Sequence, residues 1–394
     1  MGVNVFPAAS GGASYSSQPP ASASSVLLDG QLVTASSITT SVNGTGAPWL
    51  LYANGAGPTT ITIAGTPYTV TAGSTVGTSA YTGSQSVTVN GPTAAPSTFS
   101  ASTMPSNSYW NSVIYGNGYF VAVQRSATTA GAYSTNGTTW TASTMPSSSS
   151  WYSVTYGNGK FVAVATSTSS GAYSTNGTTW TASTMSASSG WYGVTYGNGY
   201  YVAVANSSTV SASSTDGINW TARTLPNSNS WEAVTYGNGY FVAVADSTTV
   251  GAYSTNGTSW TASTMPSASY WYGVGYGNGY FVAVAYGTTT AGAYSTNGTT
   301  WTASTMPSSS NWTGVTYGNG YFVAVANGTT AGAYSTNATT WTALTMPSSS
   351  NWSSVTYGNG YFVAVSQTTS ASAYYAFPSL PVAYGIHNGA TVRA

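Results

Sequence analysis

Few side chains in this chain could carry out acid–base or nucleophilic chemistry. Among 394 residues, the charged ones and the single histidine are Asp29, Asp216, Glu232, Asp246, Arg125, Lys160, Arg223, Arg393 and His387. Hydrolysis of a glycosidic bond requires two facing carboxyl groups. Glu232 and Asp246 belong to one repeat and could approach each other, but single solvated substitutions in a drifting repeat are the simpler explanation. We therefore expect no catalytic residues.

The composition excludes several other classes of site. The chain has no cysteine, which rules out disulfides, thiolate zinc sites and cysteine nucleophiles. A single histidine supports neither a histidine-based metal site nor a Ser-His-Asp set, so we expect His387 to be an ordinary residue of the C-terminal tail. The sequence predicts a protein without enzymatic activity, metal or cofactor.

Charge and hydropathy limit the partners. Charged residues make up 2% of the chain and the net charge is zero, so no electrostatic field exists to attract nucleic acid. The first residues have neither the basic nor the apolar region of a secretory signal. Apolar runs such as Phe120 to Val123 are too short to cross a bilayer, so no membrane insertion is expected.

The chain contains a repeat of 40 or 41 residues. Its most constant block, W-x-x-V-x-Y-G-N-G-x-F/Y-V-A-V, begins repeats 1 to 7 at Trp110, Trp151, Trp191, Trp231, Trp271, Trp312 and Trp352. This period is about the length of one four-stranded propeller blade. A second set of tryptophans is Trp140, Trp180, Trp220, Trp260, Trp301 and Trp341. Rings at a fixed blade position usually fill the space between sheets, so we expect both sets in the core.

Two Asn-Gly pairs in each repeat predict hairpins. In repeat 2, Asn158-Gly159 separates WYSVTYG from KFVAVA, and Asn176-Gly177 separates GAYST from TTWTAST. Asn-Gly accepts positive φ at both central positions, as a type I′ turn requires. The run FVAVA is apolar at consecutive positions, which indicates a strand covered on both faces. The predicted turn residues are Asn136, Gly137, Asn158, Gly159, Asn176, Gly177, Asp216 and Gly217.

The two ends of the repeat array complement each other. Repeat 7 lacks its fourth strand after Tyr374, whereas Thr98 to Pro105 reads TFSASTMP and matches TWTASTMP at Thr139 to Pro146. We infer that this N-terminal segment, about residues 97–103, completes the seventh blade. The predicted fold class is all-β, a closed seven-bladed propeller without exposed strand edges.

The regions outside the repeats are less regular. Residues 1–25 are rich in Ser, Ala, Gly and Pro and are predicted to be a flexible anchor segment. Short strands predict a small β-sandwich-like domain over residues 26–92. These strands are expected at Gln31 to Val33, Trp49 to Tyr52, Thr60 to Ala64, Tyr68 to Thr71 and Ser86 to Asn90. A linker (93–96), the propeller (97–376) and a C-terminal tail (377–394) complete the domain plan.

The second Asn-Gly segment resembles a known motif. Ser134-Thr-Asn136-Gly137-Thr-Thr-Trp140 and its equivalent in repeat 3, which contains Asp216, are similar to the Asp-box repeats of sialidase-like propellers. In that family the pattern is Ser-x-Asp-x-Gly-x-x-Trp and marks a structural turn between the third and fourth strands. Here the glycine comes one residue earlier and only Asp216 keeps the acid. The resemblance implies the fold alone, because a sialidase needs an arginine cluster and the three arginines here are scattered.

Whole repeats over residues 97–376 also look like those of bacteriophage tail-fibre and other virion appendage proteins. With the missing signal sequence and the lack of catalytic groups, this resemblance implies a virion structural protein, made in the host cytoplasm and displayed on the particle surface. Its expected partners are other virion proteins, through residues 1–95, and a host-surface glycan or protein, and homo-oligomerisation stays open. The alternatives are a glycan-binding lectin of a bacterial surface and, third, a glycoside hydrolase.

Recognition is expected on one face of the propeller. In a four-stranded blade, the loops between strands 2 and 3 share a face with the connections between strands 4 and 1, and here these segments vary in sequence. Loops on a rigid scaffold commonly carry recognition, and amides and aromatic rings suit a neutral sugar. The receptor- or glycan-binding candidates are Gln124, Arg125, Asn206, Asp246, Tyr286, Asn327, Tyr109 and Tyr270.

Overall fold

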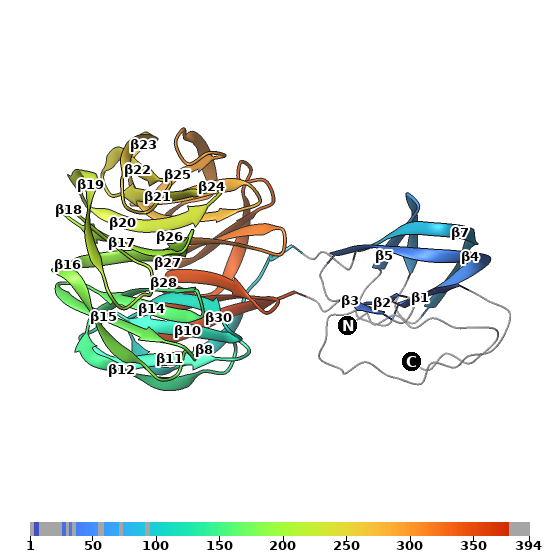
Figure 1. Cartoon of the computed structure of the whole chain (residues 1–394), viewed down its shortest axis with the longest axis horizontal. Helices are drawn as coiled ribbons and strands as arrows, with labels where there is room; N and C mark the ends of the chain where they lie inside the picture. The colour runs from blue at the N-terminus through green and yellow to red at the C-terminus, as the bar shows by residue number, and fades with distance from the viewer. Residues whose placement is uncertain are drawn as a thin grey trace. The chain divides into compact units, whose positions relative to one another are not determined.

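The chain divides into two compact units in the computed structural model (Figure 1). Unit 1 comprises residues 1–94 and 377–394, and unit 2 comprises residues 95–376. The structure describes residues 4–7, 26–28, 31–33, 37–53, 59–70, 74–90 and 95–377. Every element over these residues is a strand, and none is a helix able to span a membrane.

Unit 1 contains one seven-stranded sheet with the order β3-β2-β1-β4-β7-β5-β6. Its strands are β1 (Asn4–Pro7), β2 (Val26–Leu28), β3 (Gln31–Val33), β4 (Ser37–Ala53), β5 (Thr59–Ile63), β6 (Thr66–Val70) and β7 (Ser74–Asn90). The five predicted strand segments overlap these strands. Hydrogen bonds join them in one continuous sheet instead of the two sheets of the predicted sandwich, because β4 and β7 pair along most of their length. Most of the predicted anchor segment, the tail after Phe377 and His387 lie outside the described residues.

Unit 2 is built from the strands of the repeats. They are β8 (Ser100–Ser108), β9 (Trp110–Gly116), β10 (Tyr119–Gln124), β11 (Thr128–Ser134), β12 (Thr141–Ser149), β13 (Trp151–Gly157), β14 (Lys160–Ala165), β15 (Thr168–Ser174), β16 (Thr181–Gly197), β17 (Tyr200–Asn206), β18 (Ser208–Ser214), β19 (Thr221–Asn229), β20 (Trp231–Gly237), β21 (Tyr240–Ala245), β22 (Thr248–Ser254), β23 (Thr261–Gly277), β24 (Tyr280–Tyr286), β25 (Thr289–Ser295), β26 (Thr302–Gly318), β27 (Tyr321–Ser335), β28 (Thr342–Gly358), β29 (Tyr361–Gln367) and β30 (Thr369–Ala376). In β16, β23, β26 and β28 the fourth strand of one repeat continues into the first strand of the next.

Each repeat contributes an antiparallel sheet in chain order, as β9-β10-β11-β12 does in repeat 1. The first strands of successive repeats pack on one another, from β9 on β13 onward, and β28 of the last repeat packs on β9 of the first. The repeats therefore succeed one another around a common centre, with the first strand of each innermost. This is the architecture of a β-propeller.

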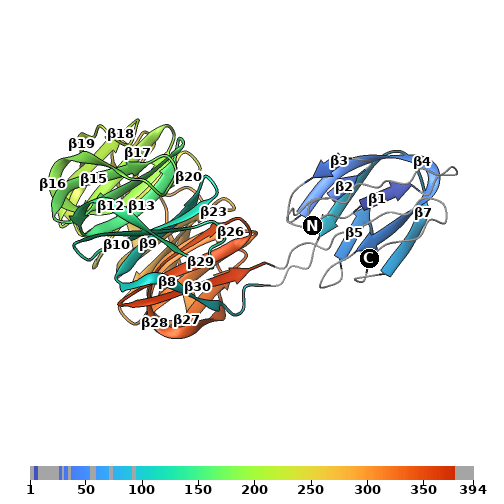
Figure 2. The same ribbon diagram turned by 90° about the horizontal axis from the view of Figure 1, so that it is seen from below.

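The segment ahead of repeat 1 pairs with the end of repeat 7. Strand β8 is antiparallel to β30, with Ala101 opposite Ala373, and Figure 2 shows the two strands side by side. An isolated parallel bridge links Thr98 to Thr345, and similar bridges join each of the other neighbouring repeats, as Thr103 to Thr139. The N-terminal segment thus occupies the place of a fourth strand next to β30.

Close packing between first strands requires glycine at the end of the W-x-x-V-x-Y-G block. A Cβ atom on Gly237 would lie 2.0 Å from the Tyr276 ring of the next repeat, and the same contact recurs between Gly358 and Tyr115. No side chain fits in that space. The tyrosine rings therefore set the distance between repeats.

The two Asn-Gly pairs of each repeat form different turns. Asn158 and Gly159 have φ of 44° and 75°, as the predicted type I′ turn requires. At the second pair only Gly177 has positive φ, so the prediction of a type I′ turn there is wrong. Instead Asn176 Oδ1 accepts the N–H groups of Thr178 and Thr179, at 3.0 and 2.9 Å. These side-chain to backbone hydrogen bonds stabilise an Asx turn in place of the two-residue type I′ turn.

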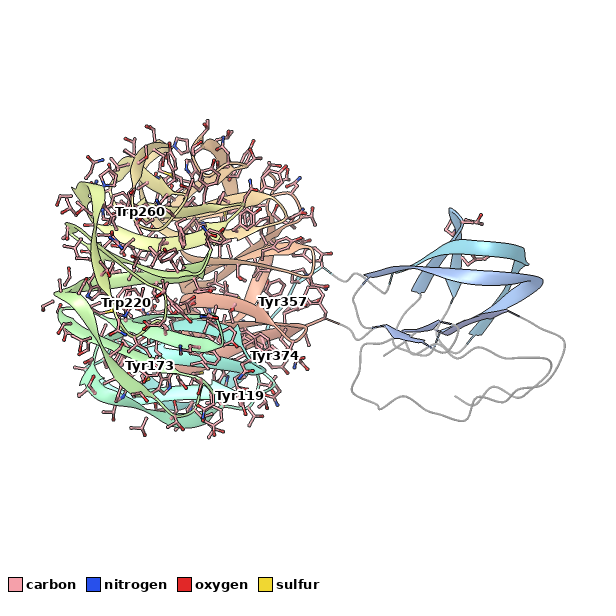
Figure 3. The ribbon with its side chains drawn as sticks, viewed as in Figure 1. Tyr119, Tyr173, Trp220, Trp260, Tyr357 and Tyr374 are labelled. Atoms are coloured by element: carbon pink, nitrogen blue, oxygen red, sulfur yellow. The ribbon has the colours of Figure 1, made fainter. Side chains whose placement is uncertain are left out.

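Both tryptophan sets lie in the core, as predicted. The first-strand tryptophans are fully buried, and the Trp110 indole N–H donates to the Ser106 carbonyl at 3.1 Å. The same bond, to the residue four places earlier, recurs in the other repeats. In the second set Trp140, Trp180, Trp301 and Trp341 are buried, and Trp220 and Trp260, labelled in Figure 3, are half-buried.

Candidate binding face

Two kinds of segment meet on one face of unit 2: the turns that follow the second strands and the connections that precede the first strands. The Arg125 N–H donates to the Tyr109 carbonyl at 3.0 Å, and in repeat 4 the Asp246 N–H donates to the Ser230 carbonyl at 2.9 Å. These bonds hold the variable segments together, and we call the surface that they form the loop face.

Five of the predicted candidates occupy the same position in different repeats, immediately after the apolar run of the second strand. Each is half-buried and lies beside the residue that precedes the first-strand tryptophan, as Tyr286 lies beside Tyr270 in repeat 5. The five are Arg125, Asn206, Asp246, Tyr286 and Asn327. The structure therefore places them as equivalent members of one ring of residues, which we call the outer set.

Tyr109 and Tyr270 are the exposed aromatic residues of this face. Their side chains are 42% and 49% exposed, respectively. The Arg125 guanidinium lies over the Tyr109 ring, 5.9 Å from its centroid, a cation–π arrangement. Both rings are available to a ligand on the loop face.

Gln124 does not belong to this surface. It is the last residue of β10, is fully buried and donates to the Thr128 hydroxyl. Repeat 1 has glutamine where the other repeats have alanine or serine, so its amide points into the interior and not toward solvent. The prediction of Gln124 as a ligand contact is therefore wrong, because β10 extends through Gln124 and the exposed loop begins one residue later.

A second set of residues, not predicted from the sequence, directly follows the first-strand tryptophans. In repeat 2 the ladder pairs Trp151 with Ala165 and Ser153 with Val164, which leaves Tyr152 unpaired in a β-bulge. A bulge of this kind redirects a side chain and is common beside functional sites. The equivalent residues are Asn111, Tyr152, Tyr192, Glu232, Tyr272, Thr313 and Ser353. Because the first strands are innermost, this set surrounds the centre of the loop face.

Three of these bulge residues are tyrosines that contact one another. The rings of Tyr152 and Tyr192 are stacked, with centroids 4.0 Å apart and an interplanar angle of 15°. The hydroxyl groups of Tyr152 and Tyr272 are 2.9 Å apart and form a hydrogen bond. Tyr272 also contacts Tyr286 of the outer set, at 5.6 Å between centroids. With Glu232 these three tyrosines form what we call the central cluster.

Glu232 is a buried carboxyl group in this cluster, 8% exposed. Its Oε1 accepts a hydrogen bond from Asn206 Nδ2 at 2.7 Å. Burial, followed by the nearby Asp246 carboxylate, raises the pKa of Glu232 to about 8, and the Asn206 bond offsets part of this rise. Glu232 and Asp246 are thus close enough to interact, in contrast to the prediction of two solvated substitutions.

The tyrosines share this electrostatic environment. Burial raises the pKa of each, and the Glu232 carboxylate raises all three further. Arg125 has the opposite effect on the pKa of Tyr192 and Tyr272. Tyr192 and Tyr272 therefore interact with both a cation of repeat 1 and the Glu232 carboxylate of repeat 4.

The remaining bulge residues are small and bind backbone. Thr313 Oγ1 donates to the Trp352 carbonyl at 2.7 Å, and Ser353 Oγ donates to the Trp110 carbonyl at 2.7 Å. Asn111 Nδ2 donates to the Tyr152 carbonyl at 2.6 Å. These bonds connect neighbouring repeats, so three of the seven bulge residues are structural and the other four carry the aromatic and acidic groups.

One signal in the sequence could have revealed the central cluster. Within the block W-x-x-V-x-Y-G tryptophan, valine and tyrosine are constant, whereas the residue after tryptophan takes five different identities in the seven repeats: Asn, Tyr, Glu, Thr and Ser. Variation confined to one site of a constant strand indicates a position that packing does not fix.

The described residues contain no group of three His, Cys, Asp or Glu side chains able to hold a metal ion. Uncharged rings, amides, two carboxyl groups and the Arg125 guanidinium form the binding chemistry of the loop face. Such an arrangement can stack on a ring, exchange hydrogen bonds with hydroxyl groups or attract a cation.

Comparison with known proteins identifies the fold. No family model matches the chain, and no curated protein matches its sequence. Virginiamycin B lyase from Staphylococcus aureus superimposes with a TM-score of 0.64 at 14% identity, covering 70% of this chain and 98% of that chain. YCF48 from Cyanidioschyzon merolae gives 0.56 at 13% identity, covering 71% and 98%. YCF48 bound to a peptide gives 0.58 at 15% identity, covering 73% and 97%.

This chain has a β-propeller fold. At these identities the likeness shows architecture and nothing about activity.

Proposed function

We propose that this chain is a non-enzymatic binding protein that attaches to a host-cell surface through the loop face of a closed seven-bladed propeller. The observation that carries the proposal is the convergence of the central cluster and the outer set on one face of a rigid scaffold. Exposed Tyr109 and Tyr270 extend this surface outward. Aromatic anchors held by packed strands are what a recognition site requires.

Closure in seven blades is part of this proposal and is supported by three contacts between the ends. Strand β8 pairs with β30, Tyr115 packs on Gly358, and Ser353 donates to the Trp110 carbonyl. A closed ring has no free sheet edge and gives its loops fixed positions.

We further propose that the protein is a structural component of a virion, a tail-fibre or capsid-appendage subunit, with unit 1 on the particle side. The repeats that resemble those of virion appendage proteins support this placement. A propeller of this fold has also been solved with a peptide bound, YCF48, which is consistent with a binding role for a propeller. A bacterial-surface lectin with the same binding face is the alternative.

Binding of the purified chain to candidate host cells tests the proposal. Tyr109→Ala and Tyr270→Ala, combined, should lower binding by about tenfold or more if these rings are anchors. Tyr200→Ala is the control, because it removes a tyrosine ring beside the Asn198-Gly199 turn on the opposite face. Equal loss in both variants, or none in either, would show that the loop face is not the binding surface.

A second candidate function is glycoside hydrolysis by Glu232 and Asp246. The observation that favours it is the raised pKa of Glu232 beside a second carboxyl group, since a general acid must hold its proton near neutral pH. Assay of neutral polysaccharides for new reducing ends decides between the candidates. If cleavage occurs and Glu232→Gln abolishes it, the protein is an enzyme; if binding occurs without cleavage, the binding function stands.

A further inference from the structure

We propose that the central cluster binds an alkylammonium group, the cationic group of amino sugars and of choline-type headgroups. This inference rests on the proposed binding function of the loop face and names the ligand chemistry at its centre. The four residues come from four successive repeats, 2 to 5, and converge on one place.

The aromatic part of the cluster supplies the first requirement. Ring faces of tyrosine carry negative potential and attract an ammonium or quaternary ammonium group, more strongly where water is excluded. Tyr152 and Tyr192 form one stacked face, and Tyr272 approaches from repeat 5 through its hydrogen bond with Tyr152. Tyr192 and Tyr272 are half-buried, so each combines desolvation with access from the loop face.

The carboxyl groups supply the second requirement. Glu232 is buried next to Asp246, and the groups that determine its pKa include no cation. Its one hydrogen-bond donor is the neutral Asn206 amide. Burial therefore favours the protonated carboxyl group, and a bound ammonium group would supply the counter-charge that its ionised form requires.

The charges around the site define its polarity. Glu232 interacts electrostatically with Tyr152 on β13, Tyr192 on β16 and Tyr272 on β23. It also interacts with Asp246 after β21 and bonds Asn206 at the end of β17. Arg125 in repeat 1 affects the pKa of Tyr192 and Tyr272. A ligand with ammonium at one end and hydroxyl or phosphate oxygen at the other would match carboxyl groups on one side and a guanidinium on the other.

A hard metal ion fits this site less well. Calcium takes roughly six to eight oxygen ligands, more than two carboxyl groups and an amide can offer even when both carboxylates are bidentate. Aromatic faces contribute nothing to such an ion, whereas they stabilise an organic cation. The combination of rings with few carboxylates therefore favours alkylammonium over metal.

A comparison of two ligands of the same shape tests the inference on the unaltered full-length chain. Choline and its uncharged isostere 3,3-dimethyl-1-butanol are titrated by calorimetry at millimolar concentration. Choline should bind roughly tenfold or more tightly, because cation–π attraction and the carboxyl groups act only on the charge. Equal binding of choline and its isostere, or no binding of either choline or glucosamine, would overturn the inference. Parallel titration of glucosamine and N-acetylglucosamine distinguishes an amino sugar from a choline headgroup as the source of the cation.

The pH dependence adds a readout that a purely apolar site would not give. An ammonium ligand prefers ionised Glu232, so choline affinity should rise between pH 6 and pH 9, and affinity for the isostere should stay level. Glu232→Gln should remove the rise and weaken choline binding. A rise that persists in Glu232→Gln would contradict the assignment of this carboxyl group.

Variants of the ring separate charge attraction from packing. Tyr192→Phe keeps the ring face and should retain choline binding within about threefold, whereas Tyr192→Leu should lose about tenfold. Tyr200→Leu is the control on the opposite face and should bind as the parent does. Melting temperatures show whether each variant is folded.

The cell-binding assay of the proposed function keeps the two conclusions distinguishable. If choline and glucosamine do not bind but the tyrosine variants of the loop face still lose cell binding, the alkylammonium inference is wrong and the binding function stands. If neither assay gives binding, both are wrong.

Discussion

The hydroxyl groups of Tyr152 and Tyr272 form a 2.9 Å hydrogen bond between residues 120 positions apart in the chain. The two tyrosines occupy the same bulge position in repeats 2 and 5, so two repeats that are not neighbours in sequence meet at the centre of the loop face. A small shift in either first strand would break the bond. The hydrogen bond therefore depends on the distance between the first strands of repeats 2 and 5.

Removing this bond should destabilise the protein measurably. Tyr152→Phe and Tyr272→Phe each delete one hydroxyl group and leave the other buried without its partner, at a cost of about 1–3 kcal/mol. The double variant should cost less than the sum, with a coupling of about 1 kcal/mol, measured by denaturant unfolding. Strict additivity would show that the hydroxyl groups do not bond in solution.

Glu232 should make stability depend on pH. Its pKa is raised to about 8 from an ordinary value of 4.5, so the folded state keeps a proton that the unfolded chain releases. The free energy of unfolding should therefore fall as pH rises from about 5 to 8, at up to about 1.4 kcal/mol per pH unit. The glutamine of Glu232→Gln cannot ionise, so the melting temperature of this variant should not change between about pH 5 and pH 8.

Asp216 provides the control for that experiment. Burial alone would raise its pKa, but hydrogen bonds from Asn219, Ile218 and Ser214 outweigh it and hold the pKa well below the usual range. Its contribution is present above its unfolded pKa and does not change between pH 5 and 9. Asp216→Asn should lower the melting temperature equally at about pH 5 and pH 9 and keep the pH dependence of the parent. If Asp216→Asn removes this pH dependence as Glu232→Gln does, Glu232 is not its source.

Regular features of this fold could be predicted from the sequence because they recur in every repeat. The type I′ turns, the buried FVAVA strands and both tryptophan cores follow from local residue patterns, as at Asn158 and Phe161. The second Asn-Gly turn was predicted wrongly because the side chain of Asn176 bonds its own backbone, which a dipeptide pattern does not reveal.

The candidate site was predicted only in part because it depends on contacts between repeats. The outer set could be predicted because its residues lie in the variable loops that follow the second strands. Two of its members, Asn206 and Asp246, interact with Glu232. The tyrosine contacts arise from a β-bulge and from the approach of repeat 5 to repeat 2. Variation after the tryptophans marks the position in the sequence but does not indicate which repeats meet.

Ala338 should be a point of strain. It has φ of 66° and occupies the place of Gly298 and the other turn glycines, where an L-residue costs about 1 kcal/mol or more. Ala338→Gly should raise the free energy of unfolding by about 0.5–1 kcal/mol, measured by denaturant unfolding. Gly298→Ala should act in the opposite direction, because its Cβ would lie 2.6 Å from Val242 Cγ2. A stability loss in Ala338→Gly would refute the strain.

Removal of β8 should open the ring. A chain that begins at residue 95 keeps β8 and its pairing with β30, whereas one that begins at residue 109 exposes the β30 edge and the space of the buried Phe99 ring. An uncharged free edge is a template for pairing with another chain. The longer form should be monodisperse in light scattering, and the shorter one should melt at least about 10 °C lower or associate, since a lost core aromatic costs about 3–5 kcal/mol. If the two forms melt alike and stay dispersed, β8 does not close the propeller, and the seven-bladed ring proposed here would have to be replaced by an open array.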